Sequence, residues 1–273
     1  MDLAELIEQQ RVKLVRDSLL SDEFLDFTQK NLAPFGTLMT YYNCALMEVE
    51  TKFRVLDEEY RLQHERDPIE SIHTRIKTVD SLARKVRKQQ IPLTLEAIEE
   101  NINDIAGVRI VCSFLDDVYM LADCLLKQDD ITLITLKDYI KNPKPSGYRS
   151  LHLVVSVPIF LKTEKRSVKV EVQIRTLAMD NWASLDHKLR YKKNLPKEDM
   201  ENLGRELAEC AEISAAMDRR MQHIRDRYWQ EEDTEAETPR PPLPGFHLAG
   251  LLTAAHQKEQ GQGSPESGVS LKS

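Results

Sequence analysis

A strict alternation of apolar and polar residues marks the segment Val168–Arg175, in the second half of the chain. A period of two predicts a β-strand that buries one face and exposes the other. The exposed face carries a cation, a carboxylate, a carboxamide and a guanidinium, from Lys169, Glu171, Gln173 and Arg175. Such groups suit a metal, a base edge and a phosphate, although the same alternation is typical of an ordinary half-solvated edge strand.

Four further segments have the composition of strands. Ile105–Phe114 is largely apolar and predicts a central strand buried on both faces. Residues 131–137 and 149–161 predict two more strands, and Ile72–Lys77 predicts a short one. We therefore expect an α+β fold with a mixed central sheet of about five strands, flanked by helices.

Two long helices are predicted ahead of these strands, over residues 3–30 and 37–65. The segment Asn31–Gly36 contains both Pro and Gly and is expected to separate them. Apolar residues recur at three- and four-residue steps in the second helix, at Leu46, Val49, Phe53 and Leu56. Further helices are expected through Lys88 with Asp80 or Ser81 as the cap, through Asn101 with Thr94 as the cap, and over residues 116–128, 177–192 and 197–229.

The composition changes at Gln230, where an acidic stretch leads into four prolines and a Gly-, Ser- and Gln-rich end. Such a segment has too few apolar residues to order itself, so we expect residues 230–273 to be a disordered tail. The remaining chain divides into a helical extension over residues 1–66, a core over residues 67–193 and a C-terminal helix over residues 194–229. No internal repeat is visible.

Bulk properties predict a cytoplasmic protein. No apolar run approaches the roughly 20 residues needed to span a bilayer, and the first residues lack the basic start and apolar centre of a signal peptide. The four cysteines are widely spaced, which favours reduced thiols over a disulfide framework or a zinc site.

The charge is unevenly distributed along the chain. A net charge of −7 argues against DNA binding and makes RNA binding unexpected. Residues 1–60 hold six Lys/Arg against twelve Asp/Glu, whereas residues 75–88 hold six Lys/Arg against one Asp. The basic run includes a strand and the first turns of a helix, where backbone amides already favour anions. A solvated helix face is the ordinary interpretation of a charge run, but this position favours binding of a triphosphate.

Asp104 and Arg109 lie immediately before and within the predicted central strand. Charged groups at such positions are normally paired, or bound to a metal or ligand. Gly107, between them, permits close approach of another group to the backbone. The alternative is a structural role, in which the aspartate caps a turn and the arginine pairs with a neighbouring carboxylate.

A proline-containing loop leads into Ser146–His152, with Lys141 and Lys144 upstream. Tyr148 is placed to stack on a nucleic-acid base, or alternatively to pack with its hydroxyl satisfied. It would share a strand face with Ser150 and His152. On the following helix, Asp180 and His187 share a face, and ordinary surface polarity accounts for most of that helix's polar residues.

Together these segments resemble the synthetase domain of the RelA/SpoT family, which makes the alarmones ppGpp and pppGpp. The resemblance covers about residues 70–193 and rests on four motifs in matching order: Arg75–Lys77 with Ser81 and Lys85, Asp104–Arg109, Gly147–His152, and Glu171–Arg175. The short chain resembles a single-domain small alarmone synthetase with a nucleotidyltransferase-like fold. It has neither the His-Asp dipeptide nor the room for the hydrolase domain of the long family members.

The resemblance implies a GTP pyrophosphokinase that transfers the β,γ-pyrophosphate of ATP to the 3′-hydroxyl of GDP or GTP. Asp104 and Glu171 would bind Mg²⁺, and Glu171 would also accept the proton of the 3′-hydroxyl. The ATP site implied by the motifs comprises Arg75 and Arg109 around the adenine, with Lys77, Ser81, Lys85 and Lys88 on the phosphates. The acceptor site comprises Tyr148, stacked on guanine, with Lys144, Arg149, His152 and Gln173.

The chain departs from the family pattern at Asp180, where some relatives have Asn near the acceptor, so the resemblance assigns no guanine or ribose role to this residue. Apolar stripes on helices 3–30 and 197–229 predict a homo-oligomer, and the resemblance implies a tetramer as one arrangement, since some small synthetases are tetramers. Two other functions remain open from the residues alone. One is a nucleotidyltransferase, which usually has an Asp-x-Asp pair that this chain lacks, and the other is a non-catalytic nucleotide- or RNA-binding regulator.

Overall fold

The computed structural model describes residues 22–64, 66–190 and 196–233. The elements follow in the order α2 (Leu32–His64), β1 (Ile69–Ile76), α3 (Val79–Gln89), α4 (Leu95–Asn101), β2 (Ala106–Cys112), α5 (Leu115–Leu126), β3 (Thr132–Asp138), β4 (Leu151–Phe160), β5 (Lys165–Thr176), α6 (Leu177–Arg190) and α7 (Lys197–Asp233). Residues up to Asp226 belong to one compact unit, and the end of α7 belongs to a second. Within the described ranges, no helix is long and apolar enough to cross a membrane.

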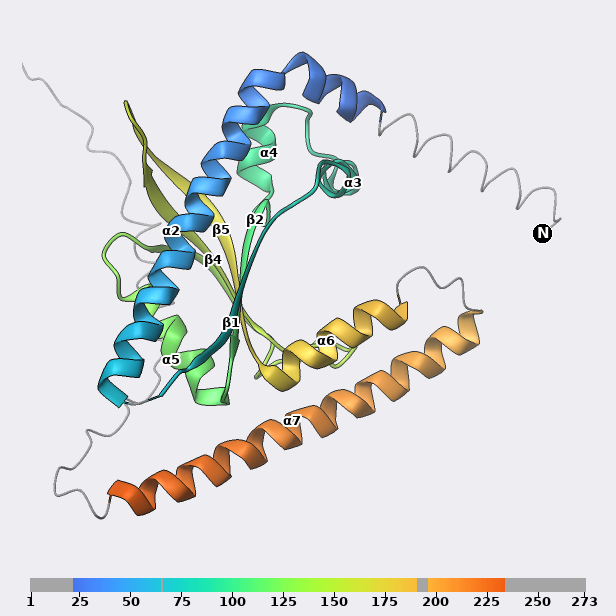
Figure 1. Ribbon diagram of the computed structural model, residues 1–273. Coiled ribbons are helices and arrows are strands. Elements are labelled where there is room, and N and C mark those ends of the chain that lie inside the picture. The colour runs from blue at the N-terminus through green and yellow to red at the C-terminus, as the bar shows by residue number, and fades with distance from the viewer. Residues whose placement is uncertain (1–21, 65, 191–195, 234–273) are drawn as a thin grey trace, which may run out of the picture. The chain divides into compact units, whose positions relative to one another are not determined.

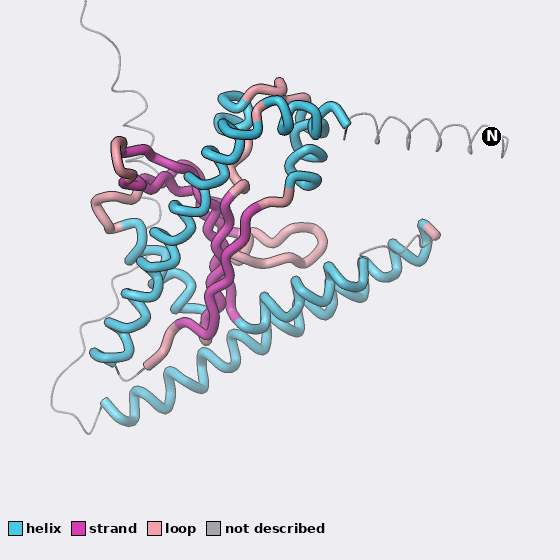
Figure 2. The backbone as a smooth tube through the Cα atoms, turned by 45° about the horizontal axis from the view of Figure 1, so that its top comes forward, coloured by secondary structure: helices cyan, strands magenta, loops and turns pink. Residues whose placement is uncertain are grey.

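As predicted, five strands form one mixed sheet, which is open, and their order is β1-β2-β5-β4-β3 (Figures 1 and 2). Strands β2 and β5 run parallel, whereas the other three neighbouring pairs are antiparallel. The predicted central strand and the alternating strand are therefore direct neighbours in the middle of the sheet, where their side chains are closest together.

The alternation in β5 separates the two faces of the sheet. Val168, Val170, Val172 and Ile174 are all at most 2% exposed. They join the main core with apolar residues of β2 and β4, while the intervening polar residues face the other way. The sheet therefore has one apolar face and one polar face.

Helices α2 and α5 cover the apolar face (Figure 1). The predicted stripe of α2 is confirmed, because Leu46, Val49, Phe53 and Leu56 are all buried in the core. The polar face is flanked instead by α3 near one end of the strands and by α6 near the other (Figure 1). Packing on the first face thus leaves the second available for a site.

The structure corrects some helix ends. The predicted breaker Asn31–Gly36 interrupts the helix only at Asn31, and Pro34 lies in the first turn of α2, where a missing N–H costs no hydrogen bond. Thr78, rather than Asp80 or Ser81, caps α3, since its hydroxyl accepts the Ser81 N–H at 3.3 Å. Helix α7 continues to Asp233, beyond the predicted end at residue 229. Most of the predicted N-terminal helix and the tail beyond residue 233 lie outside the described residues.

Candidate active site

The register of the sheet aligns the predicted site residues in two rows across the polar face. In one row Arg75 of β1 pairs with Gly107 of β2, which pairs with Glu171 of β5. In the next row Arg109 pairs with Gln173, which pairs with His152 of β4. Motifs that are almost 100 residues apart in sequence therefore meet on one surface.

Asp104, just before the start of β2, accepts hydrogen bonds from two lysines. Lys77 Nζ donates to Oδ2 at 2.8 Å, and Lys85 Nζ donates to Oδ1 at 2.6 Å. Partial burial by itself would raise the pKa of the Asp104 carboxyl, but the two ammonium groups outweigh it and hold the pKa below its usual range. Asp104 is thus an ionised carboxylate at neutral pH.

Glu171 has neutral and basic neighbours. Gln173 Nε2 donates to its Oε2 at 2.8 Å, and His152 Nδ1 lies 3.6 Å from its Oε1. Burial would raise the pKa of the Glu171 carboxyl and the charge of Asp104 acts in the same direction, but the contacts with His152 and Gln173 bring the pKa below its ordinary value. This carboxylate is therefore also ionised at neutral pH.

The two carboxylates fit a Mg²⁺ site that is completed by a substrate. In the described part of the chain, no group of three or more His, Cys, Asp or Glu residues is arranged to hold a metal. Mg²⁺ is commonly bound by only one or two carboxylates, together with waters and the phosphates of a nucleotide. Asp104 and Glu171 form such a pair, because Asp104 lies just before the strand that pairs with the strand of Glu171.

The predicted ATP residues are arranged around Asp104. The Arg75 side chain lies against Gly107, where an added Cβ would be 3.5 Å from its Nε. Ser81 lies in the first turn of α3 and its hydroxyl accepts hydrogen bonds from Thr78 and Arg84. Lys88 lies one turn beyond Lys85 and is exposed. The structure thus brings Lys77 and Lys85 to the carboxylate of Asp104, whereas Lys88 is exposed and lies further along α3.

The acceptor loop, residues 139–150 between β3 and β4, carries the predicted stacking tyrosine. The loop contains a turn at Gly147, whose backbone φ is 89°. Tyr148 contacts both of its neighbours on the polar face: Arg175 Nη2 donates to its hydroxyl at 2.6 Å, and His152 Nε2 lies 2.8 Å from the same oxygen. Since that oxygen accepts from Arg175, its own O–H can donate to Nε2 of His152.

Cations cover the Tyr148 ring in this structure. Lys144 Nζ lies 4.7 Å from the ring centroid, and the Arg175 guanidinium carbon lies 5.1 Å from it. Tyr139, which the sequence analysis did not select, is within 6.1 Å of Tyr148 and 5.2 Å of His152 between ring centroids. Nothing in the local pattern marked Tyr139, because only the folded loop brings it to the other two rings.

Arg149 is oriented differently from the other acceptor residues. Its Nη2 donates to Glu212 of α7 at 2.5 Å and its Nη1 donates to the Ile140 carbonyl. In this structure the side chain therefore ties the loop to α7, and its place in the acceptor site stays a prediction.

Two polar residues have a larger part in the site than the sequence suggested. Asp180 is not simple surface polarity, since its side chain is only 20% exposed and contacts both Arg109 and Arg175. Arg175 is 6% exposed and was not assigned to either nucleotide. The signal that could have identified Arg175 as a site residue was its position at the end of the alternating strand, because a buried guanidinium needs several partners.

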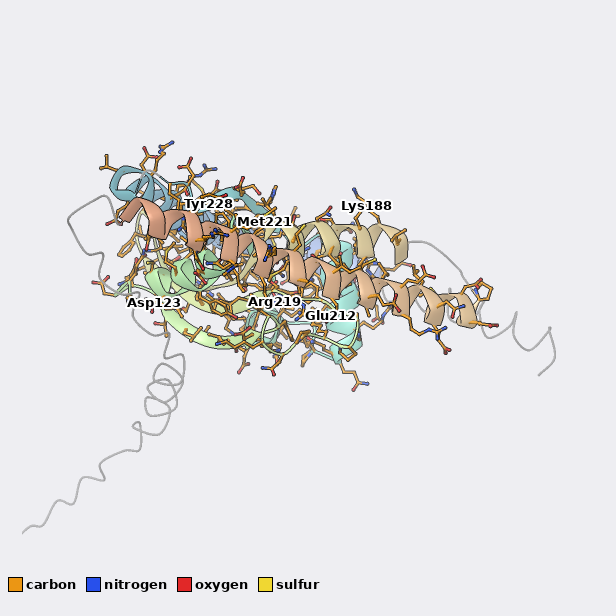
Figure 3. The ribbon with its side chains drawn as sticks, turned by 90° about the horizontal axis from the view of Figure 1, so that it is seen from below. Asp123, Lys188, Glu212, Arg219, Met221 and Tyr228 are labelled. Carbon is orange, nitrogen blue, oxygen red and sulfur yellow. The ribbon has the colours of Figure 1, made fainter. Side chains whose placement is uncertain are left out.

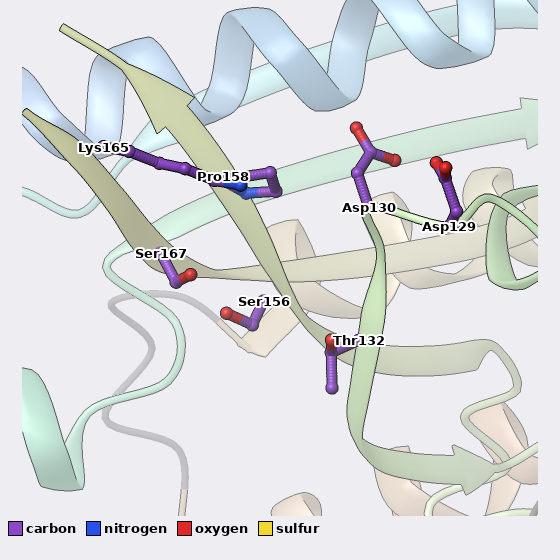
Figure 4. A pocket seen from close by; sticks show the side chains of 7 residues that line it. All are labelled: Asp129, Asp130, Thr132, Ser156, Pro158, Lys165 and Ser167. Carbon is purple, nitrogen blue, oxygen red and sulfur yellow. The ribbon is translucent and has the colours of Figure 1, made fainter.

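A shallow pocket lies beside the end of β4 and the start of β5 (Figure 4). Its lining comprises Asp129, Asp130, Thr132, Ser156, Pro158, Lys165 and Ser167. One of its carboxylates, Asp130, is already paired with Lys52 of α2. The pocket shares no residue with the predicted nucleotide sites.

Comparisons with known proteins agree with this arrangement. Residues 74–195 match the region found in RelA / SpoT proteins. The GTP pyrophosphokinase YwaC of Bacillus subtilis is 44% identical over 208 residues, which cover 76% of this chain and 97% of that protein. Crystal structures of small alarmone synthetase 1 from Bacillus subtilis are similar as well. The structure bound to its product pppGpp has a TM-score of 0.64 at 36% identity, covering 72% of this chain and 98% of that one. The structure bound to AMPCPP has a TM-score of 0.59 at 32% identity, covering 71% and 97%.

Proposed function

This chain belongs to the RelA/SpoT family, as a small alarmone synthetase, and we propose that it transfers the β,γ-pyrophosphate of ATP to the 3′-hydroxyl of GDP or GTP. The observation that carries the proposal is the polar sheet face, on which two ionised carboxylates lie beside two lysines and an acceptor tyrosine. Transfer of phosphoryl groups depends mainly on positioning and on neutralising spread negative charge, and these groups do both.

Asp104 and Glu171 would hold Mg²⁺ in this proposal. The ion supplies charge neutralisation at the phosphate oxygens when it is bound. Lys77 and Lys85 form ion pairs with the Asp104 carboxylate in this structure. Both ammonium groups are within reach of the phosphates of a nucleotide bound beside Asp104. We propose that they exchange part of this contact for phosphate oxygens, while Ser81 in the first turn of α3 and Lys88 in its last turn add further contacts.

The adenine would lie between Arg75 and Arg109, whose guanidinium planes can stack on both of its faces. Both residues project from the same face of neighbouring strands, one row apart. Arg75 is exposed and Arg109 is partly exposed, so a base can reach both guanidinium groups.

The acceptor nucleotide would stack on Tyr148, with Lys144, His152 and Gln173 around it. Stacking requires that at least one of the cations over the ring gives way, and exposed Lys144 is the one free to move. Glu171 would accept the proton of the 3′-hydroxyl. His152, which joins the Tyr148 hydroxyl to Glu171, would fix the direction of that carboxylate. Arg149 would hold the loop on α7.

The test is an incubation of the purified protein with ATP, Mg²⁺ and GDP or GTP, followed by chromatography of the nucleotides. We expect a pyrophosphorylated guanosine nucleotide with the wild type, and a loss of about a hundredfold or more with Glu171→Gln or Asp104→Asn. Glu209→Gln is the matched control, because Glu209 is exposed on α7. Absence of product with the wild type, or full activity of Glu171→Gln, would contradict the proposal.

We further propose that the protein acts in the cytoplasm as a homo-oligomer, for which a tetramer is one arrangement. Helix α7 supports association, since Ile213, Met217 and Met221 are 71%, 50% and 53% exposed and recur at four-residue steps (Figure 3). An apolar stripe of this kind on a surface helix is typical of a subunit contact.

A further inference from the structure

Asp180 lies between two arginines at the start of α6. Its Oδ1 is 3.2 Å from Arg109 Nη1 and 3.2 Å from Arg175 Nη1. The side chain is in the first turn of the helix, where a negative charge is favoured by the helix dipole. Among the described residues it is the only carboxylate paired with either guanidinium.

The two arginines differ in how much support they have. Arg175 is almost fully buried, and its guanidinium also donates to Gln173, Tyr148 and the Ser150 hydroxyl. Arg109 is 37% exposed at its side chain, and its buried Nε has no hydrogen-bond partner. Asp180 is therefore what fixes the direction of Arg109.

Arg175 extends the contact toward the acceptor side. It donates from Nη2 to Gln173 Oε1 at 2.6 Å, and Gln173 Nε2 donates to Glu171 Oε2 at 2.8 Å. These two bonds determine which way the amide points, because its oxygen must face the guanidinium and its nitrogen the carboxylate. The second branch runs from Arg175 to the hydroxyl of Tyr148.

We propose that Asp180 is a positioning residue that aligns the two nucleotide sites with each other. It holds Arg109 on the ATP side and, through Arg175, it holds Tyr148, Gln173 and Glu171 on the acceptor side. The inference rests on the proposed function for the identity of the nucleotides. Its physical basis is independent of them, since one carboxylate oxygen restrains guanidinium groups from two neighbouring strands.

A direct role in binding guanine is the competing explanation. A carboxylate can accept hydrogen bonds from the base, but Oδ1 of Asp180 already accepts from Arg175 and forms an ion pair with Arg109. Removing the side chain would leave a buried guanidinium without its counter-charge, which disturbs everything that Arg175 contacts. Positioning therefore predicts an effect on both substrates, whereas base recognition predicts an effect on the acceptor alone.

The experiment measures KM and kcat for ATP and for GDP with the wild type, Asp180→Ala and Asp180→Glu. We expect Asp180→Ala to raise both KM values about tenfold, and Asp180→Glu to recover part of each because it restores the charge. Asp199→Asn, an exposed charge removal on α7, is the control and should change neither. A rise confined to the KM of GDP, or no rise in either, would overturn the inference.

A double substitution identifies the route to ATP. If Asp180 acts on ATP through Arg109, then adding Asp180→Ala to Arg109→Ala leaves the KM of ATP where Arg109→Ala alone put it, while the KM of GDP still rises. Additive losses for ATP would contradict that route. Asp180→Asn, which keeps the volume, replaces the alanine variant if the latter does not fold.

Binding measurements separate this inference from the proposed activity. Calorimetric titration of the same variants with AMPCPP and with GDP needs no turnover. Inactive wild type would overturn the proposed function, whereas weaker binding of both ligands to Asp180→Ala would still support the alignment. Wild-type affinities for both ligands in Asp180→Ala would overturn the alignment even in an active enzyme.

Discussion

The side chains on the polar face are held mainly by one another. Asp104 is held by two lysines, Glu171 by an amide and an imidazole, and Arg175 by a carboxylate, an amide and a hydroxyl. Such pairing keeps the carboxylates ionised, because the pKa of each is held below its usual range. A nucleotide phosphate, a base or Mg²⁺ can take the place of each of these contacts. Because the side chains already hold one another, the polar face is ordered before a substrate binds.

At the residue scale, Tyr148 allows ring stacking to be separated from its hydroxyl contacts. We expect Tyr148→Ala to raise the KM of the acceptor by about tenfold or more, because a stacked base gains roughly 1–3 kcal/mol. Tyr148→Phe retains the ring and loses only the links to Arg175 and His152, so we expect it to keep most of the acceptor affinity and to lower kcat. Steady-state kinetics with GDP varied at saturating ATP provides the measurement. Equal KM increases in both variants would contradict a stacking role.

At the scale of elements, α7 supports the acceptor loop. Trp182 of α6 donates to the Leu207 carbonyl at 2.8 Å, and both residues belong to a small second core with Ala211. The loop rests on this core at Gly147, and Arg149 reaches Glu212 beside it (Figure 3 labels Glu212 on the helix). A helix more than 50 residues away in sequence thus determines where the tyrosine stands.

Gly147→Ala should displace the acceptor loop. A Cβ at this position would lie 2.6 Å from Ala211 Cβ, and the φ of 89° disfavours any L side chain. We expect a loss of about 1–3 kcal/mol in the free energy of unfolding and a larger rise in the KM of GDP than in that of ATP. Thermal melts and steady-state kinetics measure both effects.

Gly36→Ala is the matched control for Gly147→Ala. A Cβ at Gly36 in the first turns of α2 would meet nothing within 4 Å, and alanine is the better helix former. The control should therefore be as stable as the wild type or more stable, with unchanged KM values. A Gly147→Ala protein that matched it would contradict the role of α7 in placing the loop.

Asp218 makes the docking of α7 sensitive to pH. Its Oδ2 accepts the Thr176 hydroxyl at 2.7 Å, and Thr176 Oγ1 in turn accepts the Met179 N–H at the start of α6. Burial raises the pKa of Asp218, although the Thr176 contact opposes the change. The folded state thus binds this proton more tightly than the unfolded chain, so the contribution of Asp218 to stability falls as pH rises through its folded-state pKa.

Asp218→Asn should remove this loss. The amide oxygen still accepts from Thr176, and no charge has to be buried, so we expect a higher melting temperature than wild type at pH 8 and a smaller difference at pH 4. Melting curves across this range make the comparison. A variant that is less stable than wild type at pH 8 would show that the ionised carboxylate stabilises the contact.

Local patterns predicted the elements better than the contacts between them. The strands were predictable because alternation and apolar runs depend only on which face is buried, as Val172 beside Gln173 illustrates. Thr94 was predicted correctly as a cap because a cap is a local contact. The partners of Asp180 and the direction of Arg149 depend on strand order and on where α7 packs, which no local pattern contains. Pro34 misled the prediction because a first-turn proline and a breaker look alike in sequence.

At the scale of the whole molecule, the apolar stripe of α7 predicts self-association. We expect Ile213→Glu to reduce the mass of the wild-type oligomer in light scattering coupled to size exclusion, because it places a charge at the most exposed residue of the stripe. Leu93→Glu, at a less exposed loop position outside α7, is the control and should leave the mass unchanged. A wild-type protein with the mass of one 31.5 kDa chain would contradict the association.

The central claim is transfer of an intact pyrophosphate group to a guanosine nucleotide on the polar face of this sheet. The most direct measurement is ³¹P NMR of the wild-type protein with ATP, GDP and Mg²⁺, with the products quantified. We predict one AMP for each guanosine nucleotide that gains a 3′-diphosphate, and no free pyrophosphate. Release of pyrophosphate with AMP attached to an acceptor, or consumption of ATP without a new guanosine product, would contradict the account.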